Sequence, residues 1–173
     1  GKDFVRLLHT AYSAEPPFLV YEYIDGGNLD GWLDSFAGKP PPAGEVLSVL
    51  KMTARAVAAA HAQGIVHRDI KPSNLLLVRR TGEEAKIADF GIAKLSGGEN
   101  LTREGSFVGT VGYLSPEQAR GKNVDARSDV YSLGVVGYLM LTGELPFRAT
   151  NTPAMLMKHI SDPPPPVDRR RPD

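Results

Sequence analysis

The sequence lacks cysteine, an excess of either charge and any long apolar run. Without Cys the chain forms neither a disulfide framework nor a thiolate metal site. Lys and Arg number 20, as do Asp and Glu, so net charge gives no reason to expect binding to nucleic acid or to an anionic membrane. The most apolar stretch, residues 133–141, is far shorter than the roughly 20 residues that span a bilayer.

The length of 173 residues suits one domain with a buried core. No signal peptide is visible at the start, and Gly1 is not Met, so we expect this chain to be a piece of a longer product. The absence of Cys fits a reducing cytosol. We therefore expect a cytoplasmic location, with any membrane anchor of the full-length protein outside this segment.

Two short motifs carry most of the functional information. They are His-Arg-Asp-Ile-Lys-Pro-Ser-Asn at residues 67–74 and Asp-Phe-Gly at residues 89–91. A given tripeptide occurs by chance at about one position in 10,000. Two such matches in this order, with an Asn five residues after the first Asp, are not accidental.

The spacing within these motifs has a chemical meaning. Asp69 and Lys71 are two residues apart, so in extended backbone both side chains point to the same side, and Pro72 keeps the segment from closing into a helix. Asn74 offers a neutral oxygen, and Asp89 a charged one, to a hard cation such as Mg²⁺. A base for a hydroxyl, a cation for phosphate and two metal ligands predict a phosphoryl-transfer site.

The rest of the chain predicts a small strand-containing part followed by a mainly helical body. Apolar residues at steps of three and four predict a helix that stops near Gly64, with His61 interpreted as a packing residue. The residues that define its apolar face are Leu47, Leu50, Ala54, Val57 and His61. The other expected elements are strands at 4–8, 18–24, 75–78 and 85–88, helices at 29–36, 128–141 and 152–160, and a long surface segment at 92–115.

From residue 1 to about residue 166, this order of motifs and elements resembles the protein kinase domain, entered partway through. It is most similar to bacterial Ser/Thr kinases of eukaryotic type, as the stretch Tyr-Leu-Ser-Pro-Glu-Gln-Ala-Arg-Gly at 113–121 suggests. The resemblance implies an α+β fold of the protein-kinase type. Residues 1–24 would be the end of the N-lobe with the start of the hinge, and residues 25–173 an incomplete, mainly α-helical C-lobe.

The resemblance also implies roles for residues on the nucleotide side. Tyr21 would be the gatekeeper at the back of the nucleotide pocket. The backbone of Glu22 to Ile24 would be the hinge that pairs with adenine, and Leu76 would pack beneath the adenine ring.

A second set of roles concerns the reaction itself. Asp69 would be the catalytic base that accepts and orients the substrate hydroxyl, and Lys71 would stabilise charge on the transferring phosphoryl group. Asn74 and Asp89 would hold the magnesium ions. Thr110 would contact the catalytic loop beside the substrate.

A third set is structural. His67 and Phe90 would form part of the hydrophobic stack that links the lobes, and Gly91 would give the backbone freedom to switch. Asp129 would hydrogen-bond the backbone of the catalytic loop. Glu117 would pair with a family Arg that this sequence does not contain.

Regulation is implied by Arg68, because an Arg before the catalytic Asp marks kinases that a phosphate in the activation segment switches on. A guanidinium binds phosphate through paired, charge-assisted hydrogen bonds. Thr102 is the expected activating site, with Ser106 as the alternative, and Glu104 would supply a permanent negative charge. The competing interpretation is that Thr102 is only a solvated loop residue.

The leading hypothesis is a protein Ser/Thr kinase domain fragment that uses ATP and Mg²⁺ and phosphorylates Ser and Thr hydroxyls of proteins. Lys71 followed by Pro72 is the Ser/Thr form, and Gly109-Thr110 before Ser115-Pro116-Glu117 points the same way. The expected partners are ATP and protein substrates, with kinase dimers for autophosphorylation and no contact of this segment with nucleic acid or membrane.

Two other hypotheses remain. A non-catalytic kinase-fold binding module or a truncated inactive product is the alternative, although the intact base and metal Asp argue against it. A small-molecule phosphotransferase is the third, against which the long segment before Ser115 argues. The sequence contains no Gly-rich phosphate loop and no strand Lys with its helix Glu partner, so we expect the 173-residue chain alone to be inactive.

Overall fold

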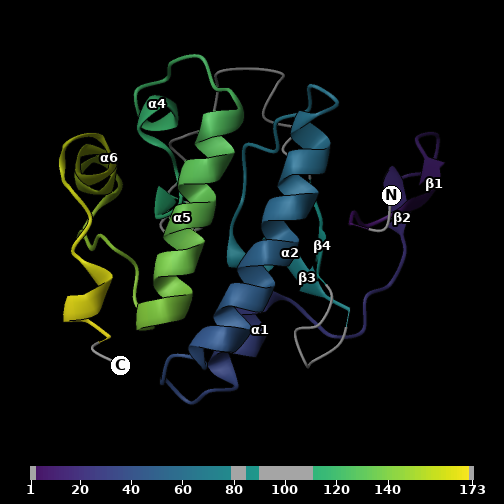
Figure 1. Ribbon diagram of the computed structural model, residues 1–173. Helices are drawn as coiled ribbons and strands as arrows, with labels where there is room; N and C mark the ends of the chain where they lie inside the picture. Colours follow the sequence, from purple (N-terminus) through teal and green to yellow (C-terminus); the bar gives the residue numbers. More distant parts are fainter. Residues whose placement is uncertain (1–2, 79–84, 90–110, 172–173) are drawn as a thin grey trace.

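The computed structural model describes residues 3–78, 85–89 and 111–171. Two small antiparallel sheets precede or lie among the helices, which confirms the expected α+β class. In Figure 1 the two longest helices run side by side, with the last helix beyond one of them and the first hairpin at the opposite edge. The elements are β1 (Leu7–Ala11), β2 (Phe18–Tyr21), α1 (Leu29–Asp34), α2 (Ala43–His61), η1 (Pro72–Asn74), β3 (Leu75–Leu77), β4 (Ala85–Ile87), α4 (Pro116–Ala119), α5 (Ala126–Thr142), α6 (Thr152–Ser161) and η3 (Val167–Arg169).

The first strand differs from the prediction, since β1 spans Leu7–Ala11 and not residues 4–8. The reason is a competing partner. The N–H of Val5 donates to the carbonyl of Ile87 in β4 over 3.0 Å, and the N–H of Ile87 donates to the carbonyl of Asp3 over 3.0 Å. Residues 3–5 therefore pair with β4, and β1 pairs with β2 only from Leu7 onward.

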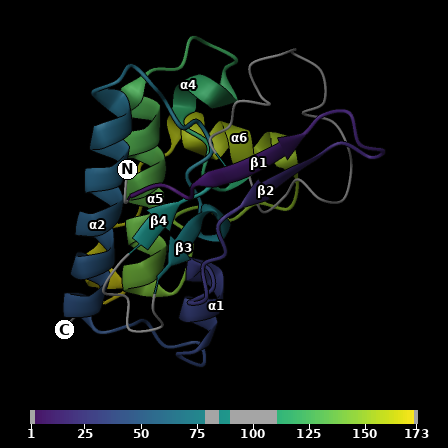
Figure 2. The same cartoon turned by 90° about the vertical axis from the view of Figure 1, so that its right-hand side faces the viewer.

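The β1–β2 hairpin extends away from the helices (Figure 2). Its second strand ends at Tyr21, short of the predicted residue 24, because Asp25-Gly26-Gly27 turns the chain toward α1. Side chains on both faces of this hairpin are at least 37% exposed. They are Leu7, Leu8, Phe18, Leu19, Val20 and Tyr21. The hairpin is joined to the body through the pairing with β4 and through an ion pair of Glu22 with Lys86 at 2.5 Å.

The long helix α2 is confirmed, but its predicted apolar face is correct only in part, at Leu50 and Val57. Leu47 is 52% exposed, and Leu50 packs on α5, where Gly137 has no side chain to obstruct it. The buried residues of α2 are Val46, Val49, Thr53, Ala56, Val57 and Ala60, and the helix contacts both α5 and β4.

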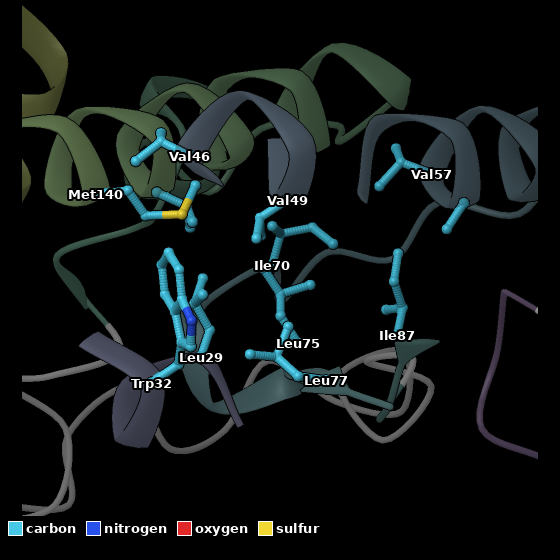
Figure 3. Packing of buried hydrophobic residues seen from close by; sticks show 12 residues of the cluster. Leu29, Trp32, Val46, Val49, Val57, Ile70, Leu75, Leu77, Ile87 and Met140 are labelled. Atoms are coloured by element: carbon cyan, nitrogen blue, oxygen red, sulfur yellow. The ribbon is translucent and has the colours of Figure 1, made fainter. Parts of the chain in front are cut away.

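The main core lies between α2, α5 and the β3–β4 hairpin, and Figure 3 shows side chains from these elements pointing toward one another. The two predicted strands pair antiparallel, with Leu75 of β3 opposite Ile87 of β4. Ile70 is 1% exposed and inserts into this core from the loop that carries Asp69 and Lys71. Because neighbours in extended backbone point to opposite sides, burial of Ile70 turns Asp69 and Lys71 away from the core.

A second cluster corrects the expectation that residues 92–115 form a surface segment. In the described part of that segment, Val111 is 1% and Leu114 9% exposed, and both pack with Phe147 and Met155. Ser115 is fully buried. The end of the segment is therefore packed against the α5–α6 region and does not lie free on the surface.

The helix α6 begins at the predicted residue 152. Its N-cap is Asn151, whose side chain accepts the N–H of Ala154. Beyond η3, Arg171 donates to the carbonyls of Pro41 and Leu141. Among the described residues, no helix is both long and apolar enough to cross a membrane.

Candidate active site

The loop 67–74 begins with a turn that the start of α5 holds in place. Arg68 has φ 68°, a left-handed conformation that is uncommon for a residue with a side chain. The N–H groups of His67 and Arg68 donate to the two carboxylate oxygens of Asp129, each over 2.8 Å. Asp129 is 1% exposed, so these are buried, charge-assisted hydrogen bonds that stabilise the turn.

Asp129 has a third partner that the sequence interpretation missed. The Nε2 of His61 lies 2.7 Å from Oδ2 of Asp129, so His61, expected to be a packing residue, instead contacts this carboxylate. His61 is the last residue of α2 and stands six positions before His67. In the sequence, only this position close to the loop could have indicated the contact with Asp129, and a lone His on a helix is more often structural.

Asp69 follows the turn directly and is held from two sides. The Nζ of Lys71 lies 3.1 Å from Oδ2 of Asp69, and the Nδ2 of Asn74 donates to the carbonyl of Asp69 over 2.8 Å and to Oδ2 over 3.2 Å. Lys71 has φ −160° and ψ 162°, the extended backbone that the spacing predicts. The structure thus brings Asp69, Lys71 and Asn74 together.

His67 connects the two sequence motifs. Its Nδ1 accepts the N–H of Asp69 over 3.2 Å, and its Nε2 lies 3.0 Å from the carbonyl of Ala88, the residue before Asp89. These partners assign the neutral tautomer with the proton on Nε2. Burial lowers the pKa of His67 below its usual value of 6.5, against the opposing effects of the Ala88 carbonyl and nearby carboxylates. The ring therefore acts here as a neutral link between the motifs.

Asn74 and Asp89 have a donor set that fits a hard cation. Two bonds from Nδ2 to Asp69 set the orientation of the Asn74 amide. Its oxygen accepts only a long hydrogen bond of 3.5 Å from the Ser73 hydroxyl among the described residues, so it can also bind a ligand. The N–H of Ala88 donates to the carbonyl of Asn74 over 2.9 Å, which ties Asp89 to η1. Asp89 is exposed and has φ 54°. An amide oxygen and an exposed carboxylate are oxygen ligands of the kind Mg²⁺ takes.

The residues expected to contact the nucleotide lie outside the loop 67–74, at the end of β2, just after it and in β3. Tyr21 ends β2 and is 43% exposed, whereas Ile24 and Leu76 are half-buried. The carboxylate of Glu22 accepts from Nζ of Lys86 and, over 2.9 Å, from the N–H of Arg6. The hydrogen bond from Lys86 and that from Arg6 lower the pKa of Glu22.

Glu117 contacts α5 through Ser128, whose hydroxyl donates to Oε1. Burial raises the pKa of Glu117, but this hydrogen bond and others outweigh burial and leave the pKa below its usual value. This partner was not expected from the sequence. The remaining predicted site residues lie outside the described residues, and they are Phe90, Gly91, Thr102, Ser106 and Thr110.

Replacing Asp129 with Ala is expected to lower the free energy of unfolding by about 2 to 4 kcal/mol, because two N–H donors of the loop lose their acceptor. Urea unfolding monitored by circular dichroism measures the loss. Asp125→Ala is the matched control, since Asp125 is an exposed N-cap of the same helix. We expect a smaller loss there, and equal losses in both variants would contradict the role given to Asp129.

Comparison with known proteins agrees with this geometry. A family model described as the protein kinase domain matches residues 2–165. Serine/threonine-protein kinase Pkn1 of Myxococcus xanthus is 48% identical over 153 residues, which are 87% of this chain and 22% of that kinase. Serine/threonine-protein kinase pkn3 of the same organism is 41% identical over 162 residues, 90% of this chain and 29% of the relative.

Serine/threonine-protein kinase PknA of Mycobacterium tuberculosis is 44% identical over 150 residues, which cover 87% of this chain and 34% of the relative. The chain thus spans a fifth to a third of the length of the curated kinases that it matches. The family model covers nearly all of it, and the first motif contacts Ala88, the residue before the second motif. The chain belongs to the protein kinase domain family.

Proposed function

We propose that this chain is the part of a protein Ser/Thr kinase that binds Mg-ATP and presents the substrate hydroxyl to the γ-phosphate. The observation that carries the proposal is the placement of Asp69, which faces away from the core and is held by Lys71 and Asn74. The Ser/Thr substrate class rests on Lys71-Pro72 and on the names of the relatives.

Each residue of the loop has a separate part in this proposal. Asp69 accepts the proton of the substrate hydroxyl and orients its oxygen toward the phosphorus. Lys71, at 3.1 Å from that carboxylate, places a cation where charge develops on the transferred group. Asn74 and Asp89 would hold Mg²⁺, which supplies charge neutralisation on the phosphate oxygens when it is bound.

The adenine side is assigned to the segment that follows β2. We propose that the backbone of Glu22 to Ile24 pairs with adenine, that Tyr21 stands at the back of the pocket and that Leu76 lies beneath the ring. The ion pair of Glu22 with Lys86 supports this assignment, because it ties the hinge segment to β4, which leads to Asp89. Residues 1–24 are then the end of the N-lobe and residues 25–173 belong to the C-lobe.

Phosphate transfer by the full-length protein tests this function. The protein is incubated with magnesium and ATP labelled at the γ-phosphate, with a generic basic protein as substrate, and the phosphorylated residues are identified by mass spectrometry. We expect label on Ser and Thr residues. Label confined to Tyr, or no transfer by a folded protein, would refute the proposal.

Regulation by phosphate is proposed for the same protein. Within the described part of the chain, no hydrogen bond or ion pair involves the guanidinium of Arg68, so it can receive a phosphate. We expect Thr102 to be the main activating site, with Ser106 as the alternative, through autophosphorylation between two kinase molecules in the cytoplasm.

Phosphosite mapping of the active full-length protein measures this directly. Thr102→Ala should lower the activity, whereas Thr142→Ala should not, because among the described residues the Thr142 hydroxyl bonds backbone groups at the end of α5. Full activity with Thr102 unmodified would show that another residue, or none, activates the kinase.

A further inference from the structure

Gln118 has no role in the function described so far, yet its side-chain amide joins two parts of the site. Its Nε2 donates to the carbonyl oxygen of Arg68 over 2.8 Å, and its Oε1 accepts the N–H of Ser115 over 3.0 Å. Gln118 lies in α4, fifty positions beyond Arg68 in sequence. Both ends of the amide are used, so the side chain is held in one orientation.

The carbonyl that Gln118 contacts belongs to the peptide group between Arg68 and Asp69. The preceding peptide donates its N–H to Asp129, so the two peptide groups on either side of the Arg68 Cα are held by different helices. Arg68 has the left-handed φ of 68°, a conformation that persists only where surrounding contacts hold it. The plane of the second peptide sets the direction in which the Asp69 side chain leaves the backbone.

The contacts close a ring around this turn. Arg68 donates to Asp129 of α5, whose neighbour Ser128 donates to Glu117 of α4, and the next residue, Gln118, returns to Arg68. Two members of the ring are buried, the carboxylate of Asp129 and the hydroxyl of Ser128, each 1% exposed. A ring of this kind resists displacement of any one member, because every neighbour is also held elsewhere.

We propose that Gln118 is a positioning residue for phosphoryl transfer: it fixes the Arg68–Asp69 peptide and so aims the Asp69 carboxylate. The same amide ties this peptide to Ser115, at the end of a segment that packs through Val111 and Leu114. Asp69 is thus coupled to the segment that precedes α4. This inference rests on the proposed function, because it gives Asp69 the task of orienting the substrate hydroxyl.

The competing explanation is that Gln118 only caps α4. Ser115 and Gln118 form a capping box, in which Ser115 Oγ also accepts the N–H of Gln118 over 3.3 Å. Substitutions that remove a single hydrogen bond distinguish the two explanations. Glu at position 118 can still accept the N–H of Ser115 but cannot donate to Arg68, whereas Ala at position 115 removes the hydroxyl cap and leaves the contact with Arg68.

The experiment measures kcat, the KM for ATP and the melting temperature of the full-length protein and its variants Gln118→Glu, Gln118→Met and Ser115→Ala. Both Gln118 variants should lose about tenfold in kcat, since misaligned reacting groups slow the chemical step. Their KM for ATP should stay within about twofold of the wild type, because Asn74 and Asp89 keep their contacts. Ser115→Ala should keep kcat within about twofold.

All assays are run at one temperature, about 20 °C below the lowest melting temperature among the variants, so that neither unfolding nor assay temperature changes kcat. A wild-type kcat in both Gln118 variants would overturn the inference, and so would an equal loss in Ser115→Ala, which would make capping the whole effect. An inactive wild-type protein would instead refute the proposed function itself.

Discussion

Asp69→Asn in the full-length protein is expected to reduce kcat by roughly 10²-fold or more, the scale of a lost acid–base group. The amide is too weak a base to accept the proton of the substrate hydroxyl. It keeps the size of the carboxylate and an oxygen that can still accept from Nδ2 of Asn74. The loop should therefore retain its shape, and the loss should appear in the chemical step and not in folding.

Asp162→Asn is the matched control for this variant. It makes the same chemical change at an exposed carboxylate, whose partners among the described residues are Lys158 and Ser161 at the surface of α6. We expect wild-type kcat there and a melting temperature close to that of the wild type in both variants. If Asp69→Asn also turned over at the wild-type rate, Asp69 could not be the base.

Asp89→Asn is expected to reduce kcat by a similar factor of roughly 10². The physical reason is different, because a carboxylate that would hold Mg²⁺ becomes a neutral amide and a weaker ligand for a hard cation. The backbone should tolerate the change well. Asp89 has φ 54°, and Asn adopts this left-handed conformation more readily than most residues.

The sign that separates this variant from Asp69→Asn is its magnesium dependence. Raising the magnesium concentration should restore part of the activity of Asp89→Asn and none of that of Asp69→Asn, because only the first loses affinity for the cation. Steady-state rates over a magnesium titration provide the measurement. Equal responses of the two variants would remove the distinction between base and metal ligand.

The loop could be predicted from the sequence because its residues are close together in the chain. The spacing of Asp69, Lys71 and Pro72 dictates extended backbone locally, and the structure has that backbone at Lys71. The family resemblance led to Asp129, which lies far away in sequence and bonds the loop backbone. No local pattern pointed to the other partners of this network, His61 and Ser128, because their contacts depend on how α2 and α4 pack against α5.

The errors in the fold have a common physical origin in tertiary packing. Residues 4 and 5 were predicted to belong to the first strand, but they pair with β4 instead. The helix α2 buries Ala56 and Ala60 and exposes Leu47, because its position against α5 and β4 decides which side is covered. Apolar periodicity predicts that a helix exists, but the face it buries is set by the shapes of its neighbours.

Nucleotide binding by three forms of the full-length protein tests the division of roles most directly. Calorimetric titration with a non-hydrolysable ATP analogue, with and without magnesium, is carried out on the wild type, Asp69→Asn and Asp89→Asn. We predict wild-type, magnesium-dependent affinity in Asp69→Asn and, in Asp89→Asn, a smaller magnesium effect that needs a higher magnesium concentration. If both variants bound the magnesium complex like the wild type, or both lost it equally, the assignment of Asp89 to the cation and of Asp69 to the hydroxyl would be wrong.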